Sequence, residues 1–75
     1  MKELIEYIAK SIADQPDEVV VTEEASDEGT TFKLQVADED KGRIIGKQGR
    51  VAQAMRTLLR VTAAKQGTRV TLEIL

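Results

Sequence analysis

"GRIIGKQGR", residues 42–50, holds three of the five glycines in this 75-residue chain, together with three basic side chains. Its centre, Gly46-Lys47-Gln48-Gly49, is a G-x-x-G tetrapeptide. The stretch is not a P-loop, because Gly42 and Gly46 are one residue too close together and Gln48 stands where that motif needs Ser or Thr. It is not a dinucleotide-binding fingerprint either, because no glycine lies two residues before Gly46.

A G-x-x-G tetrapeptide between two predicted helices has two interpretations. It is a tight turn in which glycine supplies a positive φ, or it is a place where a sugar–phosphate backbone approaches without meeting a side chain. The second interpretation gains from the helix predicted to begin at about Arg50, because unpaired amides at a helix start favour phosphate. Lys47 would add attraction that does not depend on the base sequence.

The formal net charge of −2 conceals a strong asymmetry along the chain. Residues 1–40 hold three basic residues against twelve acids. Residues 41–65 hold no acid and seven basic residues, namely Lys41, Arg43, Lys47, Arg50, Arg56, Arg60 and Lys65. A block of one sign over a third of the chain indicates a surface for a polyanion, and a solvated helix face is the alternative explanation.

The first half of the chain is predicted to be a helix followed by a hairpin. Hydrophobic spacing predicts the helix over residues 2–14, and Pro16 ends it because proline cannot continue a helix. Strands over residues 19–24 and 32–36 should pair as an antiparallel hairpin. A turn over residues 25–30 joins them, with Gly29 as its flexible point.

The second half is predicted to be mainly helical. Asp38 or Asp40 caps a short helix that runs to about Ile45. A long helix follows over residues 50–66, with Gly67 as its left-handed terminator, and alternation over residues 70–74 predicts a last strand. The order is therefore α-β-β-α-α-β in a single α+β domain, residues 1–75.

Residues 40–60, DKGRIIGKQGRVAQAMRTLLR, resemble the signature of the KH domain, whose G-x-x-G loop clamps about four nucleotides of a single strand. The element order resembles the type II KH arrangement, and the whole chain, with "QPD" at residues 15–17, resembles the small bacterial KH proteins of the KhpA family. The resemblance implies a type II KH fold with a three-stranded mixed sheet covered on one face by helices. It also implies single-stranded RNA binding, an RNA-chaperone or post-transcriptional role, a larger KhpB- or Jag-like KH partner, and a part in cell-length and cell-envelope control.

Matching the motif residue by residue assigns RNA binding to Arg43, Ile45, Gly46, Lys47, Gln48, Gly49, Arg50 and Arg56. The two aromatic residues offer no stacking platform, because Phe32 alternates with core residues and Tyr7 is expected at the rim of the first helix. Bases would lie against aliphatic side chains instead. Ile44 is expected mainly in the core, and Ile45 is equally compatible with the core and with a groove wall.

The long helix carries more apolar surface than one sheet contact needs. The side predicted to pack on the sheet holds Val51, Ala52, Met55, Leu59 and Thr62, and the opposite side holds Gln53, Arg56 and Arg60. Ala54, Leu58 and Val61 widen the apolar arc to roughly 180°, compared with the ~100° stripe of an ordinary surface helix. Single exposed aliphatics are common, but contiguous ones indicate a partner, so we expect a homodimer centred on these three residues.

The composition disfavours several function classes. The chain contains neither His nor Cys, so we expect no enzyme activity, metal site, cofactor or small-molecule substrate. No apolar run approaches the roughly 20 residues that span a bilayer, and the amphipathic N-terminus carries acids unlike a secretory signal, so a cytoplasmic location is expected. The remaining alternative to RNA binding is a protein-interaction or dimerisation module of KH shape with little RNA binding of its own.

Overall fold

The computed structural model describes residues 1–75 and has the predicted α-β-β-α-α-β order. Its regular elements are α1 (Lys2–Ile12), β1 (Val20–Ser26), β2 (Gly29–Gln35), α2 (Lys41–Ile45), α3 (Arg50–Lys65) and β3 (Val70–Ile74). Three single 3-10 turns lie between them: η1 (Pro16–Glu18), η2 (Asp38–Asp40) and η3 (Lys47–Gly49). The predicted α+β class is confirmed.

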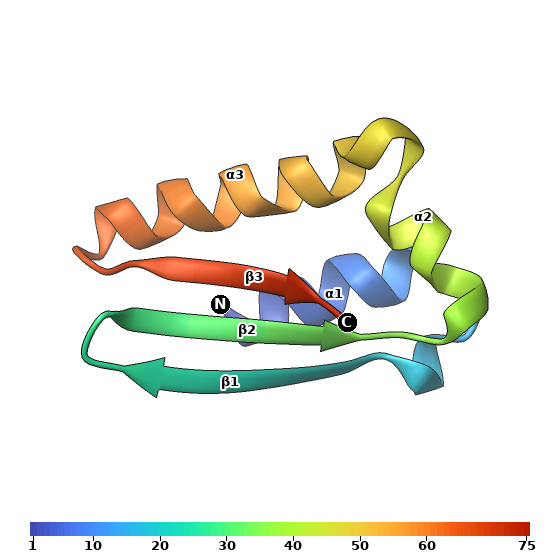
Figure 1. Ribbon diagram of the computed structural model, residues 1–75, viewed down its shortest axis with the longest axis horizontal. Helices are drawn as coiled ribbons and strands as arrows, with labels where there is room; N and C mark the ends of the chain where they lie inside the picture. The colour runs from blue at the N-terminus through green and yellow to red at the C-terminus, as the bar shows by residue number, and fades with distance from the viewer.

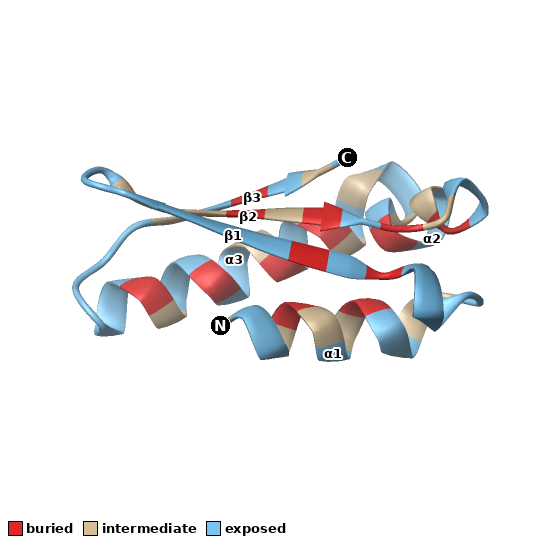
Figure 2. Ribbon diagram, turned by 90° about the horizontal axis from the view of Figure 1, so that it is seen from below, coloured by how far each residue is buried: buried red, intermediate tan, exposed pale blue.

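The three strands form one mixed sheet in the order β1-β2-β3. β1 pairs antiparallel with β2, with Val21 opposite Leu34, and β3 pairs parallel with β2, with Thr30 opposite Val70. A parallel pair needs a crossover connection, which α2 and α3 provide. β1 and β3 are therefore the two edge strands, and α1 and α3 cover the same face of the sheet (Figure 1, Figure 2).

One hydrophobic core lies between the sheet and this helical layer. Every second residue of a strand points to the same face, which places Phe32 and Leu34 of β2 inward and confirms the predicted burial of Phe32. Figure 2 shows the buried segments of α1 and α3 on the sides that face the sheet. The buried apolar side chains are Ile5, Ala9, Val19, Val21, Phe32, Leu34, Val36, Ile44, Ala52, Met55, Leu59, Ala63 and Leu72.

The two long helices end where local chemistry stops them. α1 ends at Ile12, two residues before the predicted end, because Ala13 turns to an extended conformation (φ −70°, ψ 140°) ahead of Pro16. α3 ends at Lys65, and Gly67 has φ +71°, which confirms its predicted role as a left-handed terminator. The Gly67 amide donates to the Ala64 carbonyl oxygen at 3.1 Å, so the helix end is closed by a backbone hydrogen bond.

The hairpin turn is shorter than predicted. The strands continue to Ser26 and restart at Gly29, so only Asp27 and Glu28 connect them, rather than residues 25–30. Two-residue connections suit the twist of a hairpin, and the strand pairing therefore continues to the last possible pair. Gly29 has φ +138°, and a Cβ there would lie 2.5 Å from the carbonyl oxygen of Arg69.

Asp40 occupies the N-cap position of the short helix, as predicted, but its side chain does not cap the helix. Neither Asp38 nor Asp40 makes a side-chain capping hydrogen bond, and α2 begins only at Lys41, after turn η2. Asp38 is exposed and forms an ion pair with Lys41 at 3.3 Å. Asp40 is only 1% exposed, and its carboxylate accepts hydrogen bonds from the backbone amides of Asp14 and Gln15. The carboxylate of Asp40 therefore accepts hydrogen bonds from the chain that follows α1 and not from the amides of α2.

We expect Gly29→Ala to lower the free energy of unfolding by about 2 kcal/mol or more, because the added methyl group would overlap a backbone oxygen that has no room to move. Gly42→Ala is the matched control. An added Cβ at Gly42 meets no atom within 4 Å, and alanine in α2 should raise stability by up to about 1 kcal/mol. Urea unfolding of both variants measures the two changes, and equal effects would contradict the close contact between Gly29 and Arg69.

Candidate nucleic-acid interface

The turn between α2 and α3 is built on Gly46. Its φ is +77°, and a Cβ there would lie 2.4 Å from Val51 Cγ2 and 2.9 Å from the Val51 backbone nitrogen. Conformation and contact therefore both require glycine at this position. The missing side chain lets the first turn of α3 lie directly against the end of α2.

The three residues after Gly46 leave an open surface. Lys47 and Gln48 are exposed, and Gln48 adopts the left-handed conformation with φ +58°. Non-glycine residues in this region are uncommon, and they cluster at functional sites. Gly49 has φ +73°, and an added Cβ would meet no atom within 4 Å. A side chain at the second glycine of the motif would thus contact no other part of the protein, and the space beside it is open to a ligand.

The loop leads directly into the N-terminus of α3. Gly49 occupies the N-cap position, and no side chain caps the helix. The Arg50 amide donates to the Lys47 carbonyl oxygen, but no side chain occupies the amides that follow it. This end of the helix therefore retains donor capacity, and the helix dipole adds partial positive charge at the same point. Lys47 and Arg50 contribute two formal positive charges beside them. An anion is the ligand that this end of α3 favours.

The two isoleucines before the loop have separate roles. Ile44 is fully buried and belongs to the core, as predicted. Ile45, for which the sequence leaves core and groove wall open, is 41% exposed. Its side chain is therefore available as an apolar surface next to the loop, and the loop itself is anchored to the core through Ile44.

Arg56 lies apart from the loop, further along α3. A groove of about 150 Å³ beside the free edge of β3 is lined by Arg56, Leu59, Arg60, Val70, Thr71 and Leu72. Helical spacing predicts Arg56 opposite the sheet, but the structure places it half-buried, with its Nε donating to the Leu72 carbonyl oxygen at 3.4 Å. The reason is that Arg56 lies only about 60° from the buried Leu59 around the helix.

The groove also contains residues that the motif did not identify. Arg60 follows Arg56 by four residues, so the two side chains share one side of α3, and this spacing is a signal available in the sequence. Val70 and Thr71 carry no such signal. They lie beside α3 because β3 pairs with β2 in parallel at the edge of the sheet.

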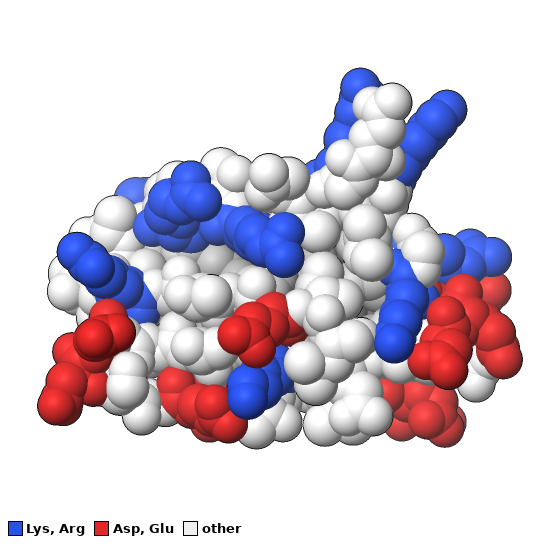
Figure 3. All heavy atoms as spheres, viewed as in Figure 1, with Lys and Arg blue, Asp and Glu red and all other residues white.

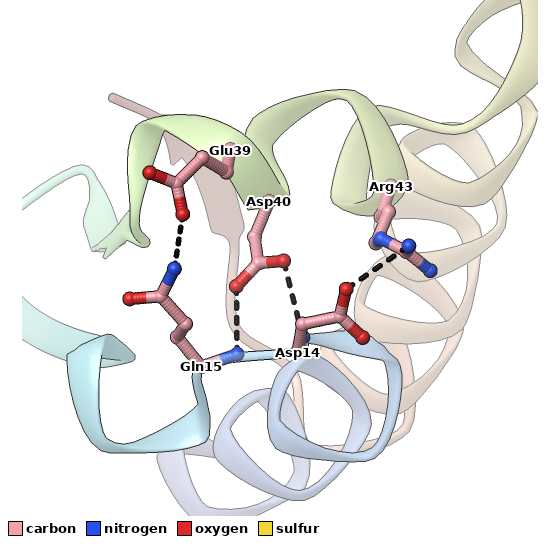
Figure 4. Close-up of polar contacts among 5 residues, drawn as sticks. All are labelled: Asp14, Gln15, Glu39, Asp40 and Arg43. Carbon is pink, nitrogen blue, oxygen red and sulfur yellow. Dashed lines mark hydrogen bonds and ion pairs between the residues drawn. The ribbon is translucent and has the colours of Figure 1, made fainter.

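Arg43 contacts α1. Its Nη2 lies 3.0 Å from Asp14 Oδ2, just beyond the end of α1 (Figure 4). Both side chains are more than half exposed, so the pair is well screened by solvent. The role of Arg43 in RNA binding stays a prediction, and its observed contact ties α2 to α1.

The charges are divided between two sides of the molecule. Figure 3 shows Lys and Arg gathered over α3 and the turn that precedes it. Asp and Glu lie mainly along the β1 side and at the end of the molecule near α2. On this face of the molecule the asymmetry of the sequence is therefore also an asymmetry of the surface, and the basic side includes the turn before α3.

A third side of α3 carries Ala54, Leu58 and Val61. All three are exposed, Leu58 by 43% and Val61 by 50%, whereas Met55 and Leu59 of the same helix are buried against the sheet. The predicted apolar strip is thus accessible to a partner.

None of the helices combines the length and the apolar character needed to pass through a bilayer. No three His, Cys, Asp or Glu side chains are grouped in a way that could hold a metal ion. The remaining surface depressions are polar and lie around the β1–β2 turn and the α3–β3 connection.

Comparison with known proteins finds relatives over the whole chain. The family model described as "KhpA/KhpB, KH domain" matches residues 2–74. The chain is 49% identical to the RNA-binding protein KhpA of Clostridium acetobutylicum, over 100% of both chains. It is 48% identical to the protein of the same name from Listeria monocytogenes, over 100% of this chain and 99% of that one. For Treponema pallidum the identity is 47%, over 99% and 92%. No solved structure matches the chain significantly.

Gly46→Ala should cost clearly more stability than Gly49→Ala. Both variants place alanine at a positive φ, which costs roughly 1–3 kcal/mol, and the cost is higher at Gly46, whose ψ of 173° lies in a region that is essentially restricted to glycine. Only Gly46→Ala also drives a methyl group into Val51, which adds about 1–3 kcal/mol. Thermal or chemical unfolding of the two variants gives the comparison, and losses of the same size would refute the tight contact between α2 and α3.

Proposed function

The chain belongs to the KhpA/KhpB family of KH domains, and we propose that it binds single-stranded RNA. The observation that carries the proposal is the open Gly49 at the uncapped start of α3, flanked by Lys47 and Arg50. The full-length relatives bear the name of an RNA-binding protein, which describes a binding protein and not an enzyme.

In the proposed complex the loop Gly46–Gly49 holds the sugar–phosphate backbone. Phosphates approach the glycines where a side chain would collide, and they accept hydrogen bonds from the first-turn amides of α3. Lys47 and Arg50 neutralise phosphates without distinguishing bases. Because a KH loop contacts about four nucleotides, we expect micromolar or weaker affinity for a monomer and a log Kd versus log salt slope of about 2–3.

The bases are proposed to lie along the β3 side of α3. Ile45 supplies an apolar wall near the loop, and the groove further along has an apolar floor that includes Leu59 and Leu72. The guanidinium groups of Arg56 and Arg60 at its rim can stack on bases, since Arg planes replace aromatic platforms in many RNA sites. Binding of this kind tolerates many sequences.

Replacing Lys47 and Gln48 together by Asp should abolish RNA binding and leave the fold intact. Both side chains are exposed, the glycines keep the turn, and two carboxylates would repel phosphate at the point of contact. Fluorescence anisotropy with a labelled single-stranded RNA measures binding, and circular dichroism checks the fold.

The chain contains its own matched control. The tripeptide Lys-Gln-Gly occurs again at residues 65–67, at the opposite end of α3, with Lys65 and Gln66 also exposed. Lys65→Asp with Gln66→Asp makes the same change of charge about 24 Å away along the helix. Its RNA affinity should fall far less. A loop variant that binds as well as the parent would overturn the proposal.

We further propose that the strip Ala54, Leu58 and Val61 forms a helix-to-helix homodimer. A two-fold axis through this strip would bury the same apolar surface twice and place two loops on one particle. Two linked weak sites hold one RNA strand much more tightly than either alone when the strand spans both. The same strip would accept a larger KhpB- or Jag-like KH partner.

Leu58→Lys should shift the protein to monomer and weaken RNA binding while leaving the loop untouched. Two lysines would face each other across the two-fold axis and lose their hydration. Val20→Lys is the control, because Val20 is equally apolar and 50% exposed but lies on β1. Analytical ultracentrifugation at tens of micromolar decides the question. A strictly monomeric parent, or a Leu58→Lys variant that still dimerises, contradicts this interface.

Family membership supports a proposal for the wider role of the protein. We propose that the protein acts in the cytoplasm as an RNA chaperone or post-transcriptional regulator, with a part in cell-length and cell-envelope control. The second candidate function is a dimerisation module with little RNA binding, which the exposed strip on α3 favours. The loop variant distinguishes the two candidate functions, because the activity of a pure dimerisation module would not change with the charge at Lys47 and Gln48.

A further inference from the structure

A buried carboxylate joins the end of α1 to the start of α2. Asp40 is 1% exposed, and its Oδ1 accepts a hydrogen bond from the Asp14 amide at 3.1 Å. Its Oδ2 accepts a hydrogen bond from the Gln15 amide at 3.0 Å. Figure 4 shows both oxygens directed at the backbone just beyond α1. Each carboxylate oxygen thus has a hydrogen-bond partner, and no buried side-chain polar atom of the protein lacks one.

Two side-chain contacts flank this carboxylate. Arg43 of α2 forms its ion pair with Asp14, and the Gln15 side-chain amide donates to the carboxylate of Glu39 (Figure 4). We call these five residues, Asp14, Gln15, Glu39, Asp40 and Arg43, the brace. The two flanking contacts are exposed and individually weak. The charge-assisted hydrogen bonds of the buried Asp40 are the strong part.

The brace acts on the element that carries the loop. α2 has only five residues, far fewer than a helix needs to be stable alone, so its orientation depends on tertiary anchors. One anchor is the buried Ile44, near the end of the helix. The other is Asp40, immediately before its first residue. A short helix fixed at both ends cannot pivot, and Gly46 follows it directly.

We infer that Asp40 is a positioning residue for RNA binding: by holding the start of α2 against the end of α1, it keeps the loop Gly46–Gly49 in its binding geometry. The inference rests on the proposed function of that loop. Without Asp40, only the exposed Arg43–Asp14 ion pair would hold the start of α2, while Ile44 and the contact of Gly46 with Val51 hold its end. The loop would then adopt the binding geometry only part of the time. If that fraction falls to about one-tenth, the apparent Kd rises about tenfold.

The charge of Asp40 makes the inference testable. Asp40→Asn removes one negative charge beside a basic block, so simple electrostatics predicts tighter RNA binding. The brace predicts the opposite, because an asparagine side chain has one oxygen acceptor for two donor amides and turns an NH₂ group toward the second. The direction of the change in affinity therefore distinguishes positioning from charge.

The experiment compares four proteins, each shown to be folded at the assay temperature: the parent, Asp40→Asn, Asp38→Asn and Val21→Ala. Asp38→Asn makes the same chemical change at an exposed acid two residues away. Val21→Ala destabilises the core from β1, away from the brace. The probe is a labelled single-stranded RNA of mixed sequence, about 12 nucleotides long, three times a KH footprint.

We expect Asp40→Asn to raise Kd about tenfold with an unchanged salt slope, since the bound state keeps its phosphate contacts. Asp38→Asn should bind as tightly as the parent or slightly more tightly, and Val21→Ala should bind like the parent. Equal Kd values for the parent and Asp40→Asn overturn the positioning role, as does an equal loss in Val21→Ala. A parent that does not bind the RNA at all overturns the proposed function instead.

If Asp40→Asn fails to fold, amide hydrogen exchange of the parent protein tests the inference instead. The Gly46 amide is bonded within α2, to the Gly42 carbonyl oxygen at 2.9 Å. If the brace holds α2, the amides of Asp14, Gln15 and Gly46 should be protected and should open together, with a common opening free energy once each rate is divided by its intrinsic exchange rate. Unprotected Asp14 and Gln15 amides would show that the brace does not hold α2 and would overturn the inference.

Discussion

The contact between Gly46 and Val51 is the constraint on which the rest of the site depends. Because position 46 has no side chain, the end of α2 and the first turn of α3 can touch, and the chain reverses within a few residues. That reversal accompanies the burial of Ile44 in the core and places the start of α3, which no side chain caps, directly after the open loop. Stability and ligand access are therefore produced by one missing side chain, which is why no larger residue can replace it without loss of both.

α3 organises the surface because its sides have different chemistry. One side packs on the sheet through Met55 and Leu59, a second lines the groove with Arg56, and a third exposes Leu58 and Val61. Neighbouring directions lie about 60° apart around the helix, so each side has its own set of outward side chains although the sides adjoin. A single helix thus presents a core side, a basic groove side and an exposed apolar side, and this economy suits a domain of 75 residues.

Much of the architecture could be predicted because it depends on periodicity and on glycine. α1, α3 and β3 each bury one side, and their apolar spacing is visible in the sequence. The left-handed conformation of Gln48 could not be predicted, since nothing marks a non-glycine residue at positive φ. Asp40 could not be separated from its two acidic neighbours either, because its burial depends on where the end of α1 lies in space. Local patterns thus specify elements, and contacts between elements specify which polar residue is buried.

The parallel pairing of β3 with β2 has a consequence for how the chain folds. Thr30 lies opposite Val70, so this pairing joins residues forty positions apart, 70 minus 30, in a chain of 75. Closing so long a loop is entropically costly, and folding rates fall as the sequence separation of contacts grows. The helices and the hairpin can form from local contacts. The core is complete only when β3 pairs with β2 and buries Leu72. During synthesis, the apolar sides of α3 and β2 are therefore exposed together until the strand that closes them has been made.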